Sequence, residues 1–204
     1  WQNQPAVIVG LNQEVNTEVN LEYLKQNDIA LARRVSGGGA VYHDWGNLNY
    51  TIVGRSEDLE RDYPEYAGLM MQALRKLGVS AELSGRNDIL VEGKKVSGFA
   101  KRVSKNRLMV HGTLMYNVNL DVLTQSLNPP ATKLQTKGIA SVRSRVTNLC
   151  EHLPEIKDIQ EILAEHLLHL TPTLFSGNKD RTANKTQLIK FLFILQCIAL
   201  VHIV

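Results

Sequence analysis

Apolar residues recur in short runs along the first half of the chain, and the polar segments between them carry helix and turn signals. Asn20 is in position to cap a short helix, LEYLKQN, over residues 21–27. Tyr63 to Leu77 has apolar residues at helical spacing and Gly78 in the stop position, which predicts a longer helix. The apolar runs that predict strands are Ala6–Gly10, Ile29–Ala32 and Leu48–Val53.

The second half begins with apolar segments that short turns separate, of which Glu92-Gly93-Lys94 is the clearest, so we expect β-hairpins. Asn119 then caps a short helix, and Pro154 opens an amphipathic helix that runs to Leu170. The predicted strands are Val79–Leu83, Ile89–Val91, Val96–Val103 and Arg107–Val118. Hairpins without repeated strand-helix-strand units predict an α/β (α+β) fold, with a mixed, largely antiparallel sheet flanked by helices.

The character of the chain changes from about Thr171. A polar, unpatterned segment leads to Leu188–Val204, which is nearly continuous apolar sequence broken by Lys190, Gln196 and His202. A membrane span needs about 20 apolar residues, so we expect a buried or partner-covered segment or an aberrant C-terminus. At the other end, Trp1 stands in place of methionine just before an apolar run, and we expect the true N-terminus to be missing.

Composition and charge exclude several classes. The hydrophobic fraction of 44% and the charged fraction of 21% are those of a soluble globular protein. The formal net charge of +3 suits anionic small molecules or an acidic partner, but it lacks the concentration of charge that a nucleic-acid binder needs. Cys150 and Cys197 are far apart in segments of different character, which argues against a disulfide framework and favours a reducing compartment.

The first candidate for chemistry is the segment RRVSGGGAVYHDWGNLN, which holds three glycines at positions 37 to 39. Backbone without side chains lets amide donors approach a phosphate or carboxylate closely. Arg33 and Arg34 add positive charge beside it. The alternative is a tight turn or bulge that needs positive φ. The motif is neither a Walker loop nor GxGxxG.

The second candidate, SGRNDILVEGKKVSGFAKR, places Asn87 and Asp88 before one strand and a lysine pair at the start of the next. A lysine in a partly enclosed site could neutralise a carboxylate and an α-phosphate as they meet. Asp88 could hold magnesium. The alternative is a charged hairpin tip in solvent, and the pattern alone does not separate Lys94 from Lys95.

Histidines and cysteines add little by themselves. His111 lies within an apolar strand on the same face as Thr113, where a lone histidine is more often a core residue than a catalyst. His43, on the glycine segment, is equally ambiguous. Neither cysteine lies in a setting that suits a nucleophile, and no spacing matches a zinc site.

Four segments stand in order along the chain: RRVSGGGAVYHDWGNLNYT, SGRNDILVEGKKVSGFAKR, HGTLMYNVNLD and KGIASVRSRVTNL. Together they are strongly similar to the lipoate-protein ligase A family, and the resemblance runs from Trp1 to about Leu170. It implies the biotinyl/lipoyl protein ligase-like catalytic fold. It also implies an enzyme that uses ATP and Mg²⁺ to convert (R)-lipoate, or a related acid such as octanoate, to an acyl-adenylate, and then modifies a specific lysine of a lipoyl domain.

The resemblance also implies roles for individual residues. The lysine immediately before VSG touches both the acyl carbonyl and the phosphate, which makes Lys95 rather than Lys94 the implied catalytic residue. Asp88 is the implied magnesium ligand. The residues implied in ATP and adenylate binding are Arg34, Gly39, Ala40, Val41, Tyr42, Asn87, Asp88 and Lys95. Those implied in lipoate binding are Ser36, Gly37, Gly38, Lys95 and His111.

Lipoyl-domain proteins are the implied partners, namely the acyltransferase components of 2-oxoacid dehydrogenases and the glycine-cleavage H protein, with neither nucleic acid nor membrane. The implied location is the cytoplasm, or mitochondria in a eukaryote. Related octanoyltransferases use a cysteine thioester, but the segment Ala81–Asp88, where one such family carries its nucleophile, has no cysteine. Biotin-protein ligases also form an acyl-adenylate, but their glycine motif is interleaved with arginines and does not resemble SGGGAVYHD.

The chain departs from the family at both ends. Family members begin with a strand and helix ahead of the position of Trp1, and many continue into an accessory domain. We therefore expect a catalytic domain over residues 1–170 that lacks its N-terminal segment, and an atypical tail over residues 171–204 with no accessory domain. The alternative function is a lipoyltransferase that depends on preformed lipoyl-AMP, or a non-catalytic adenylate-binding protein.

Overall fold

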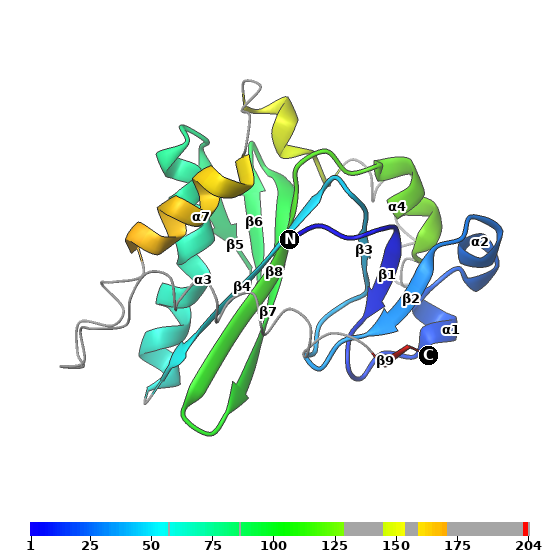
Figure 1. Ribbon diagram of the computed structural model, residues 1–204, viewed down its shortest axis with the longest axis horizontal. Coiled ribbons are helices and arrows are strands. Elements are labelled where there is room, and N and C mark those ends of the chain that lie inside the picture. Colours follow the sequence, from blue (N-terminus) through cyan, green and yellow to red (C-terminus); the bar gives the residue numbers. More distant parts are fainter. Residues whose placement is uncertain (57, 86, 129–144, 154–158, 171–201, 204) are drawn as a thin grey trace.

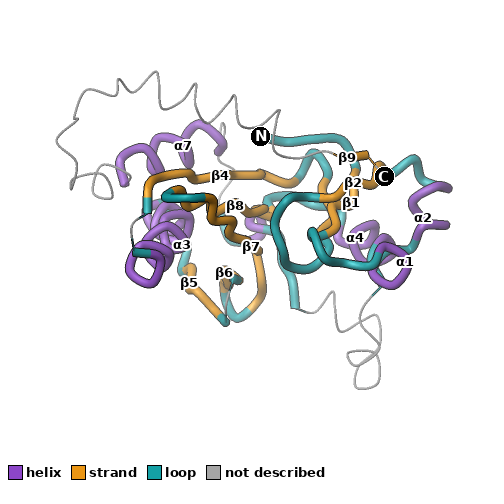
Figure 2. Tube along the Cα trace, turned by 90° about the horizontal axis from the view of Figure 1, so that it is seen from below, coloured by secondary structure: helices purple, strands orange, loops and turns teal. Residues whose placement is uncertain are grey.

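The strands form two sheets, which lie next to each other (Figures 1 and 2). The computed structural model describes residues 1–56, 58–85, 87–128, 145–153, 159–170 and 202–203. One sheet has four strands in the order β3-β1-β2-β9, and the other has five in the order β4-β8-β7-β6-β5. The predicted mixed, largely antiparallel arrangement flanked by helices is confirmed, but it is divided between two sheets.

The four-stranded sheet is mixed. β1 (Ala6–Val9) pairs parallel to β2 (Ala30–Arg33) and antiparallel to β3 (Val41–His43), and β9 (His202–Ile203) pairs with β2. The parallel crossover contains α1 (Val15–Glu18) and α2 (Leu21–Gln26). Asn20 caps α2 as predicted, because its Oδ1 accepts from the Tyr23 amide.

The five-stranded sheet is antiparallel throughout. Its strands are β4 (Asn47–Arg55), β5 (Ala81–Ser84), β6 (Asp88–Val91), β7 (Lys94–Ser104) and β8 (Arg107–Met115). The helices α3 (Leu59–Lys76) and α7 (Ile159–Leu170) pack together against one of its faces (Figure 1). The face turned away from these helices is available for a site.

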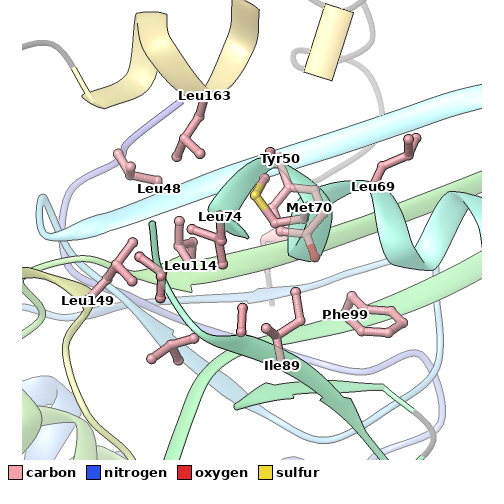
Figure 3. Packing of buried hydrophobic residues seen from close by; sticks show 14 of the residues in the cluster. Leu48, Tyr50, Leu69, Met70, Leu74, Ile89, Phe99, Leu114, Leu149 and Leu163 are labelled. Carbon is pink, nitrogen blue, oxygen red and sulfur yellow. The ribbon is translucent and has the colours of Figure 1, made fainter. Parts of the chain in front are cut away.

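Leucine and other apolar side chains fill the space between the five-stranded sheet and its helices (Figure 3). Leu74 of α3, Ile89 of β6 and Leu114 of β8 are fully buried there, and each such side chain contributes about 1.5–3 kcal/mol. A second cluster joins the four-stranded sheet to α2 and to α4 (Leu120–Ser126). The two sheets therefore have separate cores.

Several boundaries differ from the sequence prediction. The long helix begins at Leu59 rather than Tyr63, because the Asp58 side chain accepts from the Glu60 amide and starts the first turn. The strand β3, the helix α1 and the 3₁₀ turn η1 (Leu149–Glu151) were missed, since each is too short for a periodic signal.

Two further predictions concern residues outside those that the structure describes. The opening of the last helix at Pro154 and nearly all of the tail from residue 171 lie outside the described residues. Among those that are described, no helix is long and apolar enough to cross a membrane.

Candidate functional site

The glycine loop joins β2 to β3, and the buried Arg34 side chain lies inside it. Its guanidinium donates to the backbone oxygens of Ile8 (3.0 Å), Gly37 (2.8 Å) and Gly39 (2.7 Å). Burial lowers the pKa of Arg34, but a guanidinium remains charged in proteins. Arg34 therefore holds the loop in shape from within.

The orientation of the glycine carbonyls decides where the loop amides point. The oxygens of Gly37 and Gly39 face Arg34, and in a trans peptide the following N–H points the opposite way. The amides of Gly38 and Ala40 consequently face away from the arginine, and neither donates to another described residue. Gly38 also has a φ of 98°. The loop is thus both a turn and a pair of outward amides, an arrangement that suits an anion.

The second wall of the site is formed by β6 and β7. Lys95 Nζ lies 2.7 Å from Asp88 Oδ1, and the two side chains are 35% and 36% exposed. Lys94, at the hairpin turn, is exposed, and strand alternation puts its side chain on the opposite face of the sheet from that of Lys95. The structure therefore separates the two lysines that the pattern left open, and pairs only Lys95 with the predicted carboxylate.

Asn87 lies just before β6, and its hydrogen bonds stabilise the pairing of β6 with β7. Its side-chain Nδ2 donates to the Phe99 oxygen at 2.9 Å, and the Phe99 amide donates to the Asn87 oxygen at 3.0 Å. A nucleotide contact from this side chain would have to use its Oδ1.

Ser36 and His111 connect the two walls. Ser36 Oγ lies 2.6 Å from His111 Nε2, although the residues are 75 positions apart, and the bond joins the loop after β2 to β8 of the other sheet. Arg102 of β7 also donates to the Val35 oxygen. These bonds place the glycine loop over the face of the five-stranded sheet that is turned away from α3. The residues predicted to bind lipoate and those predicted to bind the nucleotide are thereby brought together.

Two histidines beside Arg34 are held neutral. Burial, followed by the charge of Arg34, lowers the pKa of His111 to about 4. Burial, then Arg34 and His111, lowers the pKa of His43 to about 4 as well. His43 Nδ1 lies 3.2 Å from Asn3 Oδ1, and its Nε2 has no partner among the described residues. Arg34 is therefore the fixed positive charge of this group.

Sequence reasoning did not assign His43 or Arg102 to the site. Both lie inside the segments named above as candidates for chemistry, and the position of Arg102 in its strand could have indicated that it faces the site. It follows Gly98 by four residues on β7, so strand alternation puts both on one face.

The Tyr42 side chain is buried, and those of Ala40 and Val41 are half-buried against apolar neighbours. Ala40 and Tyr42 belong to the cluster beneath the four-stranded sheet, and Val41 packs against Ala6 and Ile8. Burial, followed by the charge of Asp44, raises the pKa of Tyr42 to about 12. A contact from Tyr42 to an adenylate would use the backbone.

A pocket of about 440 Å³ lies elsewhere, lined by Pro5, Asn27, Ile29, Tyr42, Asp44, Trp45, Gly46, Asn117, Asn119 and Val122. It excludes Arg34, Lys95 and His111, and Tyr42 is its one lining residue among those predicted for the site. Within the described ranges, no group of three or more His, Cys, Asp or Glu residues is arranged to hold a metal ion.

The chain matches the model of the lipoyl protein ligase A/B catalytic domain over residues 1–169. It is 43% identical over 179 residues to lipoate-protein ligase LplJ of Bacillus subtilis, a match that covers 87% of this chain and 54% of the relative. The chain spans about half the length of the curated relatives it matches.

Two solved structures share the fold. A bi-partite lipoate protein ligase of Thermoplasma acidophilum, described with its E2 lipoyl domain, is 32% identical with a TM-score of 0.75; the match covers 85% of this chain and 69% of that one. A lipoate-protein ligase A bound with ATP is 30% identical with a TM-score of 0.72, covering 85% and 70%.

Proposed function

The chain belongs to the lipoyl protein ligase A/B catalytic domain family, and we propose that it is a lipoate-protein ligase. In this proposal it uses ATP to convert (R)-lipoate to lipoyl-AMP and then transfers the lipoyl group to a lysine of a lipoyl-domain protein. The observation that carries the proposal is that two sets of groups suited to anions lie in one site: the Lys95–Asp88 pair on β6 and β7, and the outward amides of the glycine loop.

The reaction joins two anions, and its chemistry matches what these walls offer. A lipoate carboxylate oxygen attacks the α-phosphorus of ATP, and the bond to the bridging oxygen breaks as pyrophosphate leaves with the electron pair. The acceptor amine then attacks the acyl carbonyl, loses a proton, and displaces AMP. Repulsion and misorientation are the main obstacles, so fixed positive charge and hydrogen-bond donors are what the first step needs.

We assign Lys95 to the junction of the two anions, where its ammonium neutralises the carboxylate and the α-phosphate. The amides of Gly38 and Ala40 bind the adenylate phosphate, and the backbone of Val41 and Tyr42 lines the nucleotide. Arg34 supports them by ordering the loop and by its charge. Ser36, Gly37 and His111 form the lipoate side, with His111 as a neutral hydrogen-bonding group.

The site offers magnesium one carboxylate. Mg²⁺ is commonly held by one or two carboxylates together with substrate phosphates and water, and when bound it neutralises phosphate charge. Asp88 supplies one carboxylate, of which Oδ1 is already an acceptor for Lys95. We propose that Asp88, with Asn87 beside it in sequence, would hold the metal, and that the phosphates would supply further ligands.

The proposed acceptors are lipoyl domains of 2-oxoacid dehydrogenase acyltransferases and the glycine-cleavage H protein. The Thermoplasma acidophilum ligase was solved in a study of that ligase and its E2 lipoyl domain, which supports an acceptor of this class. A cytoplasmic location is part of the same proposal, as is a catalytic domain that ends near residue 170.

The test separates activation from transfer. The chain is incubated with lipoate, Mg²⁺ and ATP labelled at the α-phosphate, and labelled lipoyl-AMP is quantified before and after addition of apo H protein. We expect ATP-dependent lipoyl-AMP and then lipoylated H protein. A parallel reaction starts from preformed lipoyl-AMP, and isothermal titration compares lipoate, octanoate and biotin. Transfer from preformed lipoyl-AMP without its synthesis would replace ligase by lipoyltransferase, and failure of both steps would falsify the enzymatic proposal.

A further inference from the structure

An irregularity in β7 determines which face of the sheet Lys95 occupies. Ile89 pairs with Ser97, but the next residue of β6, Leu90, pairs with Lys95, so Val96 is an extra residue in β7. In a regular strand Lys95 would share a face with Ser97 and Phe99, and these two are buried on the side of α3. The bulge instead turns Lys95 to the opposite face.

The pairing partners identify that opposite face. Asp88 pairs with Gly98, and Gly98 pairs in turn with Thr113 of β8. His111 lies two residues before Thr113 and is therefore on the same face. Lys95, Asp88, Gly98 and His111 consequently share one surface, which is the candidate site.

Gly98 lies directly beneath the end of the lysine side chain. A Cβ at this position would be 2.9 Å from Lys95 Nζ and 3.1 Å from Lys95 Cε, and 3.9 Å from Asp88 Oδ1. No backbone atom lies that close to the same point. Any side chain at residue 98 would therefore compete with the ammonium for its place beside the carboxylate.

Hydrogen bonds to a neighbouring segment hold the backbone of Lys95 in place. Its amide donates to the Arg145 oxygen at 2.8 Å, and its own oxygen accepts from the Thr147 amide at 3.1 Å. With the main chain held on both sides, the flexible four-carbon side chain is the part that would shift. Gly98 has no positive φ that would require glycine, so its absent side chain needs another explanation.

We propose that Gly98 is a positioning residue for acyl activation, and that it leaves open the space in which the Lys95 ammonium sits beside Asp88. The inference rests on the proposed function, because it concerns the lysine that joins lipoate to ATP. Gly98 is not among the residues proposed above to bind substrate. The bulge at Val96 also gains a role, since the bulge and Gly98 together determine where the Lys95 ammonium lies.

The central test is Gly98→Ala. Alanine is favoured over glycine in a strand interior, so the melting temperature should stay the same or rise. The kcat for lipoyl-AMP formation should fall about 10²-fold, as expected for an ångström-scale misplacement of a reacting group, with a smaller change in the KM for ATP. In a Lys95→Ala background, where the two atoms closest to a Cβ at residue 98 are gone, Gly98→Ala should have no further effect.

Gly112→Ala is the matched contrast on the neighbouring strand. Its Cβ would lie 2.6 Å from the Tyr50 hydroxyl oxygen and 2.7 Å from the Gly98 backbone oxygen. This substitution should lower the melting temperature, because a backbone atom and a buried ring stand in the way. Gly98→Ala behaving like Gly112→Ala, with lost stability, would mean that Gly98 serves the fold and would overturn the proposal.

Crystal structures of the parent chain and Gly98→Ala decide the geometry without any activity. We expect the separation between Lys95 Nζ and Asp88 Oδ1 to leave hydrogen-bonding range in the variant. An unmoved ammonium overturns the inference, even if the parent is a ligase. A displaced ammonium supports it, even if the parent makes no lipoyl-AMP, in which case only the proposed function fails.

Discussion

The two walls of the site use positive charge in opposite ways. At the start of the glycine loop, half-buried Arg33 and buried Arg34 both donate to backbone oxygens, among them those of Gly10 and Gly37. On the five-stranded sheet, Lys95 reaches over an empty glycine position and pairs with a carboxylate that is itself one third exposed. The arginines are part of the scaffold, whereas the lysine is available to a ligand.

The difference follows from the shape of each group. A guanidinium has five donors in a rigid plane, so one buried Arg34 can hold three backbone oxygens at once and order a loop that has few side chains of its own. An ammonium on a flexible stem is a point charge that can exchange one anion for another. Removing Arg34 should therefore damage the fold, and removing Lys95 should damage the chemistry.

The largest expected effect is that of Lys95→Ala on catalysis. Loss of the charge at the junction of carboxylate and phosphate should reduce lipoyl-AMP formation about 10²–10³-fold. The free energy of unfolding should change by less than about 1 kcal/mol, since partly exposed ion pairs contribute little. Lys94→Ala, the exposed neighbour, is the matched control and should retain activity. Equal losses in both variants would contradict the assignment.

Arg34→Met should have the next largest effect, which is a loss of stability. It removes the donors to the oxygens of Ile8, Gly37 and Gly39 and leaves these acceptors without them. We expect a loss of about 3 kcal/mol in the free energy of unfolding, measured by urea denaturation. Arg102→Met, which removes an exposed arginine with a single backbone bond, should cost less than about 1 kcal/mol. A stable Arg34→Met variant would show that the loop does not depend on this side chain.

His111 predicts a dependence of stability on pH. Its pKa is about 4 in the folded protein against an ordinary 6.5, so above pH 6.5 it is neutral in both states. Between pH 6.5 and 4 the unfolded chain binds a proton that the folded chain does not, and stability falls as the pH falls. At pH 5 this amounts to about 2 kcal/mol.

The measurement compares urea denaturation at pH 7 and pH 5. His111→Gln keeps a nitrogen near Ser36 but cannot titrate, so the drop between the two pH values should shrink by about 2 kcal/mol. His169→Gln, which removes an exposed histidine of α7, should retain the drop of the parent chain. A full drop in His111→Gln would exclude this histidine as the source.

Asp88→Asn should change stability as little as Lys95→Ala does. Its partner Lys95 is partly solvated, so the free energy of unfolding should change by less than about 1 kcal/mol. If Asp88 also contacts magnesium, half-maximal lipoyl-AMP formation should need a higher Mg²⁺ concentration. Glu92→Gln, at the exposed hairpin turn, should leave that requirement unchanged. An identical Mg²⁺ titration in Asp88→Asn would remove this residue from the metal site.

Much of the fold was predictable because its signals are local. Asn20 and Asn119 cap helices through their own side chains, and the hairpin around Glu92-Gly93 follows from turn chemistry. The division of the strands between two sheets had no such signal. It depends on which strand edges meet, and apolar runs of similar length do not encode that choice.

For the site, the sequence by itself determined which chemical groups were available: a backbone run without side chains, two arginines beside it, and a lysine pair near a carboxylate. Only the tertiary structure decided their use. Arg34 points inward because the backbone oxygens of Ile8, Gly37 and Gly39 surround it, and His111 meets Ser36 because the glycine loop lies over the other sheet. Lys95 rather than Lys94 faces Asp88 because the extra residue at Val96 resets strand alternation. Side-chain direction depends on pairing register, and register is a property of the assembled sheet.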